Sequence, residues 1–233
     1  MYVEPGQPSP AHGLHLSHGG TGMASLSAAT PYARVKRGLD LLGAGLLLLA
    51  LLPLFGLLVV LIRADGGPGL FRHQRVGRGG RLFWCYKFRS MRMDADAVLA
   101  ALLASNHAAR QEWQARQKLA QDPRVTPLGR FLRSTSLDEL PQLLNVLNGE
   151  MSLVGPRPVT ARELLARYGD GSAWYLSVRP GITGLWQVSG RSTTSYEERV
   201  ELDVRYAMSL SFRTDLLVLL RTPWAVLRRR GAC

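Results

Sequence analysis

Two adjacent carboxylates, Asp138 and Glu139, lie between Arg133 and Arg157 in the sequence. Carboxylates beside arginines can hold a metal ion and a phosphate together, which is what phosphoryl chemistry requires. The same stretch also fits a local structural role, because Ser136 and Glu139 have the spacing of a helix capping box. Both interpretations hold together, since a helix N-terminus is itself an anion-binding site. We therefore predict a phosphate site at the start of an apolar helix.

Two further stretches place polar residues in segments whose proline or glycine content restricts or shapes the backbone. Arg157 lies between prolines, which restrict the backbone and suit a pre-organised phosphate ligand, although a structural turn with a solvated arginine is the simpler alternative. Residues 178–191 contain several glycines, so we expect this loop, which ends at Arg191, to come close to another part of the molecule. Asp203 falls on a predicted helix over 196–208, where a surface salt bridge with Arg199 competes with a functional role.

The composition limits the class of partner. The chain has 233 residues and a formal net charge of +12, which suits one domain with appendages and a polyanionic partner: nucleic acid, anionic lipid or a phosphorylated substrate. Cys85 and Cys233 support no disulfide framework, so a reducing compartment is expected. The histidines predict no metal cluster, and residues 1–31 are predicted to be a flexible extension that does not resemble a signal peptide.

An uncharged apolar run covers residues 41–62, with basic residues at both ends. Its length suits one transmembrane helix. Pro53 near the middle should kink or break that helix, and each half is then too short to cross a bilayer. Positive charge at both ends also fits a segment that enters and leaves by the cytoplasmic face. The residues alone leave a spanning helix and a re-entrant helix–break–helix open.

The stretch after the apolar run predicts a basic β-hairpin. Two short β-like segments, residues 71–76 and 82–88, are separated by glycines. We expect its basic side chains to share a small surface: Arg72, Arg75, Arg78, Arg81, Lys87 and Arg89. Basic and aromatic residues together can bind single-stranded nucleic acid or lipid headgroups. The adjacent apolar run favours lipid, so we predict no nucleic-acid partner.

The remaining sequence predicts helices. One helix is expected over 94–118, a second at 130–133 after a turn-rich connector, and apolar or amphipathic segments over 212–220 and 222–230. The last two either lie in a bilayer interface or pack onto the core. The predicted fold is α+β: a flexible extension (1–31), a membrane segment (32–64) and a small domain of helices with a short hairpin or sheet (65–233).

From about residue 32 onwards the sequence resembles the bacterial sugar transferases, also called monotopic phosphoglycosyl transferases. The matching segments occur in the family's order and spacing: 36–40, the apolar run with Pro53, 87–91, 136–141, 151–158, 179–187 and 202–203. Leu52 differs from the Ser that many members have before the membrane proline. We expect the minimal form of the family, without further upstream helices.

The resemblance implies a fold and an activity. Members sit on the cytoplasmic face of the bacterial inner membrane through a re-entrant helix. They transfer a sugar 1-phosphate from a UDP-sugar to polyprenyl (undecaprenyl) phosphate with Mg²⁺, release UMP, and begin lipid-linked polysaccharide assembly. Galactose or glucose is the expected sugar, and a homodimer is among the expected oligomeric states.

The resemblance also implies residue roles. Asp138 is the nucleophile that forms a covalent aspartyl–phosphosugar intermediate, favoured as the ionised form near a helix N-terminus. Glu139 is the Mg²⁺ ligand. The other matched polar positions surround the phosphates, the metal and the nucleotide: Lys87, Arg133, Arg157, Arg191 and Asp203.

Two other functions stay open on the residues themselves. A non-catalytic membrane adaptor would bind anionic lipid or nucleic acid through residues 72–89 and would not need Asp138 or Glu139. A spanning anchor would instead place the residues beyond Arg63 outside the cell.

Overall fold

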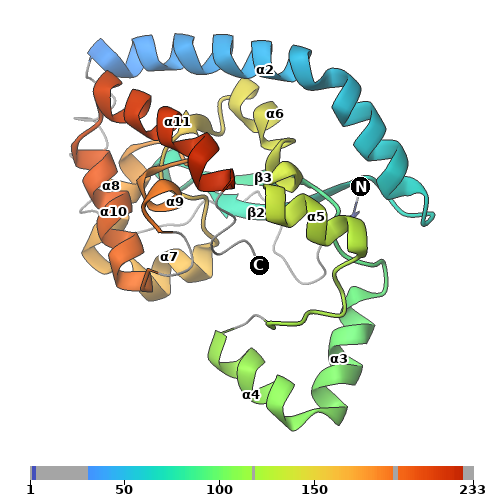
Figure 1. The fold of residues 1–233 in the computed structure, drawn as a ribbon. Helices are drawn as coiled ribbons and strands as arrows, with labels where there is room; N and C mark the ends of the chain where they lie inside the picture. The colour runs from blue at the N-terminus through green and yellow to red at the C-terminus, as the bar shows by residue number, and fades with distance from the viewer. Residues whose placement is uncertain (1, 4–30, 117–118, 191–193, 228–233) are drawn as a thin grey trace.

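The computed structural model describes residues 2–3, 31–116, 119–190 and 194–227. Helices dominate this part of the chain, and the strands form two small sheets, which agrees with the predicted α+β class (Figure 1). The α-helices are α2 (Pro31–Arg63), α3 (Ala95–Ser105), α4 (His107–Arg116), α5 (Pro127–Thr135), α6 (Gln142–Leu147), α7 (Ala161–Arg167), α8 (Ser172–Ser177), α9 (Leu185–Ser189), α10 (Tyr196–Met208) and α11 (Phe212–Leu227). The strands and 3-10 turns are β1 (Tyr2–Val3), β2 (Leu70–Val76), η1 (Arg78–Gly80), β3 (Leu82–Phe88), η2 (Leu137–Glu139), β4 (Ser152–Val154), η3 (Gly169–Gly171) and β5 (Gly181–Thr183).

The predicted hairpin is confirmed. β2 and β3 pair antiparallel, with Leu70 opposite Phe88 at one end and Val76 opposite Leu82 at the other. At the tip, Gly79 has a φ of 68°, a left-handed conformation that favours glycine. The sequence did not predict β1, which pairs parallel with β2. β1 falls within the expected flexible extension, and residues 4–30 of that extension lie outside the described part of the chain.

The apolar run forms the core of α2, a single helix of 33 residues. Pro53 lies inside this helix, and α2 changes direction part-way along its length (Figure 1). The expected helix–break–helix is therefore one bent helix. Within the described residues, α2 is the one helix long and apolar enough to cross a membrane. Its outer face leaves large side chains in solvent, and Leu49 is 71% exposed.

A basic and acidic motif near the start of α2 joins this helix to three other elements. Lys36 forms an ion pair with Asp215 of α11 at 2.6 Å. Arg37 donates to the carbonyl of Val146, at 2.7 Å, near the C-terminal end of α6. Asp40 accepts from the hydroxyl of Ser152 in β4 at 2.8 Å. These contacts fix the membrane segment against the rest of the fold.

The far end of α2 is held by Arg89, which follows β3. Its Nη2 donates to the carbonyl of Ile62 at 2.8 Å, and its Nη1 donates to Asp65 at 2.8 Å. The inner face of α2 also contributes to two hydrophobic clusters, through Ala44 in one and Leu58 in the other. The apolar helix therefore shares its core with the residues after position 64.

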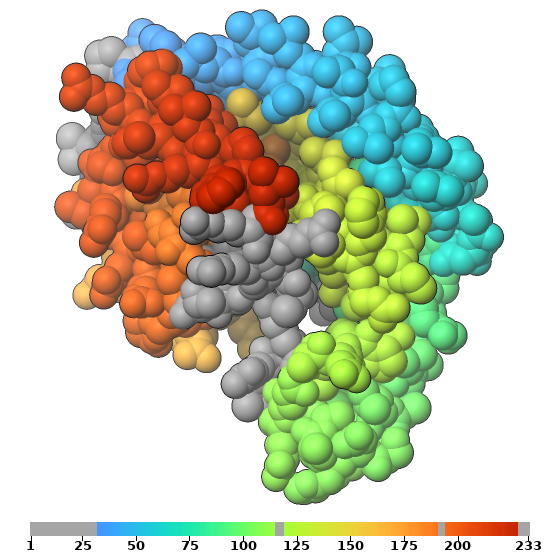
Figure 2. Space-filling view, viewed as in Figure 1, coloured from blue at the N-terminus to red at the C-terminus, as the bar shows by residue number. Residues whose placement is uncertain are grey.

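The single helix predicted over 94–118 is wrong in its middle. Asn106 has an extended conformation (φ −121°, ψ 109°) and separates α3 from α4. Together α3 and α4 project from the side of the molecule opposite α2 (Figure 2).

The two predicted C-terminal segments form one helix, α11, with Pro223 inside it. One face packs on the core through Asp215 and Val218. The other face is apolar and exposed, and Leu220 is 68% exposed. The expected packing on the core is therefore confirmed for one face of this amphipathic helix, and the bilayer position stays a prediction for the other.

Candidate active site

The carboxylate pair lies in a tight connection between two helices. α5 ends at Thr135, Ser136 adopts a left-handed conformation with a φ of 58°, and η2 carries Asp138 and Glu139. Pro141 is then the N-cap of α6. This path turns the chain sharply and presents both carboxylates at the start of α6.

The predicted capping box at Ser136 is wrong. Ser136 terminates α5, its backbone N–H donates to the carbonyl of Arg133, and its side chain makes no capping bond. Glu139 is drawn instead toward Lys87. The capping boxes lie elsewhere, at Thr160 with Glu163 and at Ser195 with Glu198.

A cavity of about 690 Å³ opens beside this turn. It brings together the following predicted site residues from β3, α5, η2 and the segment after β4: Lys87, Arg133, Asp138, Glu139 and Arg157. Such a volume falls in the range of small-molecule sites. The sequence placed these residues far apart, and the fold collects them around one space.

The hairpin supplies a cation to the carboxylates. Side chains alternate between the two faces of a strand, so Phe71, His73 and Arg75 of β2 share one face with Lys87 of β3. All of them line the cavity. Lys87 Nζ lies 2.7 Å from Glu139 Oε1.

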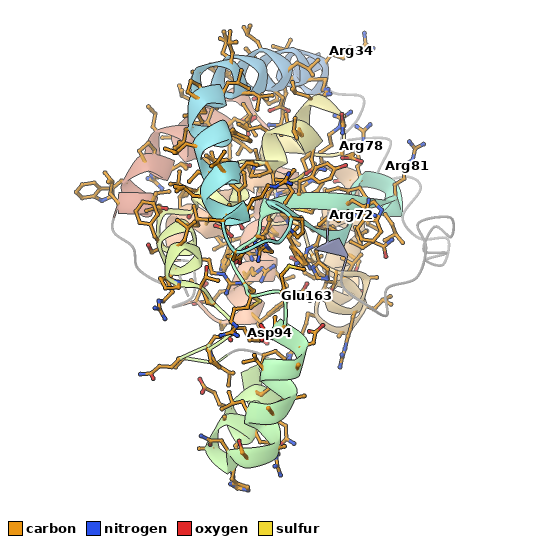
Figure 3. All side chains as sticks on the ribbon, turned by 90° about the vertical axis from the view of Figure 1, so that its right-hand side faces the viewer. Arg34, Arg72, Arg78, Arg81, Asp94 and Glu163 are labelled. Carbon is orange, nitrogen blue, oxygen red and sulfur yellow. The ribbon has the colours of Figure 1, made fainter. Side chains whose placement is uncertain are left out.

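Three of the six basic residues expected to share one surface, Arg72, Arg78 and Arg81, do not line the cavity, whereas Arg75, Lys87 and Arg89 do. The expected crowding of all six on one surface is therefore wrong. Arg72 stacks over the ring of Trp84, 4.6 Å from its centroid. Arg78 and Arg81 are exposed and point away from the molecule at the tip of the hairpin (Figure 3). Along the strands, alternation therefore places Arg75 and Lys87 toward the cavity and Arg72 on the opposite face.

Asp138 is 8% exposed yet lines the cavity. Burial raises the pKa of its carboxyl, Lys87 opposes this most strongly, and Glu139 reinforces it. Arg133 also lowers the pKa of Asp138. We expected a helix N-terminus to favour the ionised form of Asp138. Its pKa depends instead on burial, which raises it, and on the nearby cations, which lower it.

Arg133 is held by a hydroxyl. Its Nε donates to Ser90 Oγ at 2.8 Å, and Ser90 follows Arg89 at the end of the hairpin. Burial lowers the pKa of this guanidinium and Asp138 raises it, so the two groups stabilise each other's charged form.

Asn145, a residue not predicted from the sequence, helps to position the site. This fully buried residue of α6 accepts from the backbone N–H of Tyr86 at 3.0 Å and donates to the carbonyl of Trp84 at 2.7 Å. It therefore pairs with two backbone polar groups of β3. These bonds hold β3, which carries Lys87, against α6, which follows Glu139. The available signal was an asparagine with two apolar residues on each side, within residues 143–147.

Two glycine-rich motifs place Arg157. β4 and β5 pair parallel, and a Cβ on Gly155 would lie 2.4 Å from the carbonyl oxygen of Arg179. A Cβ on Gly181 would lie 2.0 Å from the backbone nitrogen of Gly155. The predicted close approach of the 178–191 loop is therefore confirmed, and its neighbour is the motif that leads to Arg157.

Asp203 takes a supporting position. It is 1% exposed and is not among the residues that line the cavity. Its carboxylate accepts from Tyr168 Oη at 2.7 Å and from the backbone N–H of Arg157. Burial raises its pKa to about 6. The alternative surface salt bridge with Arg199 is wrong, because both side chains are buried. Arg191 lies outside the described residues.

The cavity thus contains a nearly buried carboxylate, Asp138, together with the cations Lys87 and Arg133. Phosphoryl chemistry requires such a combination of charges. A family model described as "Bacterial sugar transferase" matches residues 31–229. The chain belongs to the bacterial sugar transferase family.

Relatives within the family are similar over most of this chain. The undecaprenyl-phosphate galactose phosphotransferase of Salmonella typhimurium is 50% identical over 198 residues, which cover 85% of this chain and 41% of that protein. The exopolysaccharide production protein ExoY of Sinorhizobium fredii is 48% identical over 198 residues, covering 84% of this chain and 87% of ExoY. The undecaprenyl-phosphate glucose phosphotransferase of Komagataeibacter xylinus is 40% identical over 198 residues, covering 80% and 35%. The chain thus spans less than half of two of these relatives and most of the third.

Proposed function

We propose that this protein transfers a sugar 1-phosphate from a UDP-sugar to polyprenyl (undecaprenyl) phosphate and releases UMP. The observation that carries the proposal is the position of Asp138, a nearly buried carboxylate that lines the cavity between Lys87 and Arg133. The names of the relatives, which include galactose and glucose phosphotransferases, support the same substrate class.

The first step would be attack by a carboxylate oxygen of Asp138 on the β-phosphorus of the UDP-sugar. A bond forms between that oxygen and the β-phosphorus, and the bond from the β-phosphorus to the oxygen that bridges the two phosphates breaks. UMP leaves with that oxygen, and the sugar phosphate stays on Asp138. A covalent intermediate divides one difficult transfer into two easier ones.

The second step would reverse the chemistry with another nucleophile. An oxygen of polyprenyl phosphate attacks the phosphorus on Asp138, the acyl phosphate bond breaks, and the carboxylate is regenerated. The product is a polyprenyl diphosphate-linked sugar. No proton transfer is needed if both attacking oxygens are ionised.

The cations would act in both steps. Lys87 and Arg133 lower the pKa of Asp138, so they favour the ionised nucleophile despite its burial. The same positive charges would balance the negative charge on the transferring phosphate in a site that excludes water. Arg157, which also lines the cavity, adds a planar donor suited to phosphate oxygens.

We expect Mg²⁺ to take part. Among the described residues no group of three or more acidic, His or Cys side chains forms a metal site. Mg²⁺ nevertheless often binds through one or two carboxylates with phosphate and water, so Glu139 beside Asp138 fits as its protein ligand. When bound, the metal would neutralise phosphate charge. Stabilisation by Mg²⁺ in a thermal melt should be lost in Glu139→Gln, and retention of that stabilisation would exclude Glu139 as the ligand.

The membrane arrangement we propose is re-entrant, with both ends of α2 on the cytoplasmic face of the inner membrane. The bend in α2, the basic residues at both of its ends and the exposed apolar face of α11 support it. Cysteines introduced one at a time at exposed Arg34 and Ala64, in a chain with Cys233→Ser that keeps the buried Cys85, should both react with an impermeant maleimide in inside-out vesicles and not in intact cells. Labelling from opposite sides would indicate a spanning helix.

The activity is tested with purified full-length protein, undecaprenyl phosphate and a panel of UDP-sugars that includes UDP-galactose and UDP-glucose. UMP release and a lipid-linked product are expected with at least one sugar. Asp138→Asn should lower UMP release by about 10³-fold or more. The proposal fails if no sugar of the panel gives UMP, or if Asp138→Asn keeps the wild-type rate. In that outcome, salt-sensitive binding to anionic vesicles would favour the membrane adaptor.

A further inference from the structure

The cavity contains a further buried cation, Arg199. It lies on α10, is 9% exposed and is among the residues that line the cavity. The sequence singled it out only as a partner for Asp203. Its surroundings indicate a binding role.

Aromatic rings cover the guanidinium of Arg199. Its Cζ lies 4.6 Å from the ring centroid of Trp186 and 4.9 Å from the ring centroid of Tyr196. Such stacking holds a guanidinium in place and leaves its N–H edges for hydrogen bonds. Arg199 is thus pre-organised by its neighbours.

One edge of this guanidinium has no partner within the described part of the chain. Both Nε and Nη2 of Arg199 are buried and make no hydrogen bond to the described residues. These two nitrogens form the side-on fork that binds two oxygens of a phosphate or carboxylate. Buried donors without partners are rare and cost free energy, so an intact, unpaired fork indicates a ligand that enters through the cavity.

The acids near Arg199 are already engaged. Asp203 accepts from Tyr168 Oη at 2.7 Å, and Glu163 Oε2 accepts from the backbone N–H of Thr160 at 2.8 Å. Glu163 also lies 3.5 Å from Arg75 Nη1. Both acids lie close enough to Arg199 for its charge to lower their pKa values. Neither forms an ion pair with Arg199 among the described residues.

The local charge favours an anion. The ring of Trp186 carries a second guanidinium, because Arg157 Cζ lies 5.4 Å from its centroid. Arg157 and Arg199 thus place two cations around one aromatic ring at the wall of the cavity.

We infer that the Nε and Nη2 fork of Arg199 binds the phosphate of the nucleotide leaving group, the α-phosphate of the donor that becomes the phosphate of UMP. Lys87 and Arg133 then serve the phosphate that is transferred to Asp138. Arg199 therefore discriminates a nucleotide from a nucleoside. The identity of this ligand rests on the proposed function, in which UMP is the leaving group.

The experiment compares UMP with uridine as ligands of the full-length protein in nanodiscs, measured by isothermal titration calorimetry. Arg199→Met should weaken UMP binding by about 10- to 100-fold, because a charge-assisted bidentate contact is lost. Its effect on uridine should be less than about threefold. Arg205→Met, an exposed arginine on the same helix, is the matched control and should bind UMP like the wild type.

A second variant separates binding from folding. Arg199→Lys keeps the positive charge but lacks the fork, so it should retain the wild-type melting temperature more closely and still lose most of the preference for UMP over uridine. Unchanged UMP affinity in both variants overturns the inference. Equal weakening of UMP and uridine also overturns it, because the contact would then be to the base or ribose.

Failure of the inference and failure of the proposed function are distinguishable. Arg199-dependent UMP binding without any sugar transfer would support the UMP site and contradict the proposed activity. Sugar transfer that depends on Asp138, with UMP binding unaffected by Arg199, would contradict the inference alone.

Discussion

Asp138 and Asp203 are both nearly buried acids with raised pKa values, yet the structure uses them differently. Asp138 lines the cavity and faces the cations Lys87 and Arg133. Asp203 does not line it, and its carboxylate is held by the hydroxyl of Tyr168 and the backbone of Arg157. Burial alone therefore does not identify a nucleophile. The distinguishing features are access from the cavity and facing positive charge.

The largest expected effect comes from the accessible acid. Asp138→Asn should lower UMP release by about 10³-fold or more, because the amide cannot form the covalent intermediate. Asp203→Asn, the matched control, should cost less than about tenfold. Labelled sugar phosphate that stays on the protein without acceptor lipid should be seen for the wild type and Asp203→Asn only. Equal losses in both variants would remove the distinction between the two acids.

The buried acid should control stability with pH. The pKa of Asp203 is raised to about 6 in the folded protein, so its protonated form is favoured by folding. The stability this contributes is present at low pH and is lost as the pH rises from about 4 through about 6. Relative to the wild type, Asp203→Asn should therefore gain up to about 3 kcal/mol in unfolding free energy between pH 4 and pH 7.

Denaturant unfolding at several pH values measures this difference for Asp203→Asn. Asp170→Asn, an exposed acid on η3, is the control for removal of a negative charge. A difference between wild type and Asp203→Asn that stays constant from pH 4 to pH 7 would contradict the prediction.

A smaller effect is expected from the cation that faces Asp138. Lys87 lowers the pKa of this acid, so Lys87→Met should move the acidic limb of the pH–rate profile to higher pH. The rate should fall by about 10- to 100-fold, since phosphate stabilisation is lost as well. Arg81→Met, an exposed cation on the same hairpin, should leave the profile in place. An unmoved acidic limb in Lys87→Met would show that Lys87 does not tune Asp138.

The smallest effect concerns the partner of Asp203. Tyr168→Phe removes the hydroxyl that lies 2.7 Å from this carboxylate, and should cost about 1 kcal/mol of unfolding free energy at pH 7. Tyr196→Phe is a close control, because the Tyr196 hydroxyl is buried without a hydrogen-bond partner among the described residues and its loss should be nearly neutral. Thermal melts compare the two, and equal destabilisation would contradict the role of the Tyr168 hydroxyl.

Local patterns predicted the elements that depend on local contacts. Alternating residues and glycines gave the β2–β3 pairing, and the uncharged run gave α2. Prediction failed where distant contacts compete with local ones. Ser136 and Glu139 have capping-box spacing, but Ser136 terminates α5 and Glu139 pairs with Lys87. Spacing could not reveal that competition, because Lys87 belongs to a separate strand.

In the candidate site, too, the sequence predicted which residues take part but not the effects of contacts between distant elements. Asp138, Glu139 and the basic residues around them could be named from their types and from family resemblance. Their pKa directions could not, since burial and facing charges depend on which elements meet. Asn145 was missed, and Arg199 was considered only as a partner of Asp203, for the same reason: their contacts include residues on other elements.

By itself, the sequence determined the apolar length of α2, the pairing of the hairpin and the family signature, because these are set by residue order over short spans. Only the tertiary structure decided that Asp138 faces the cavity while Asp203 lies behind Arg157, and that Arg199 stacks between Trp186 and Tyr196. The physical reason is that desolvation and Coulomb interactions act between groups close in space, wherever they lie along the chain.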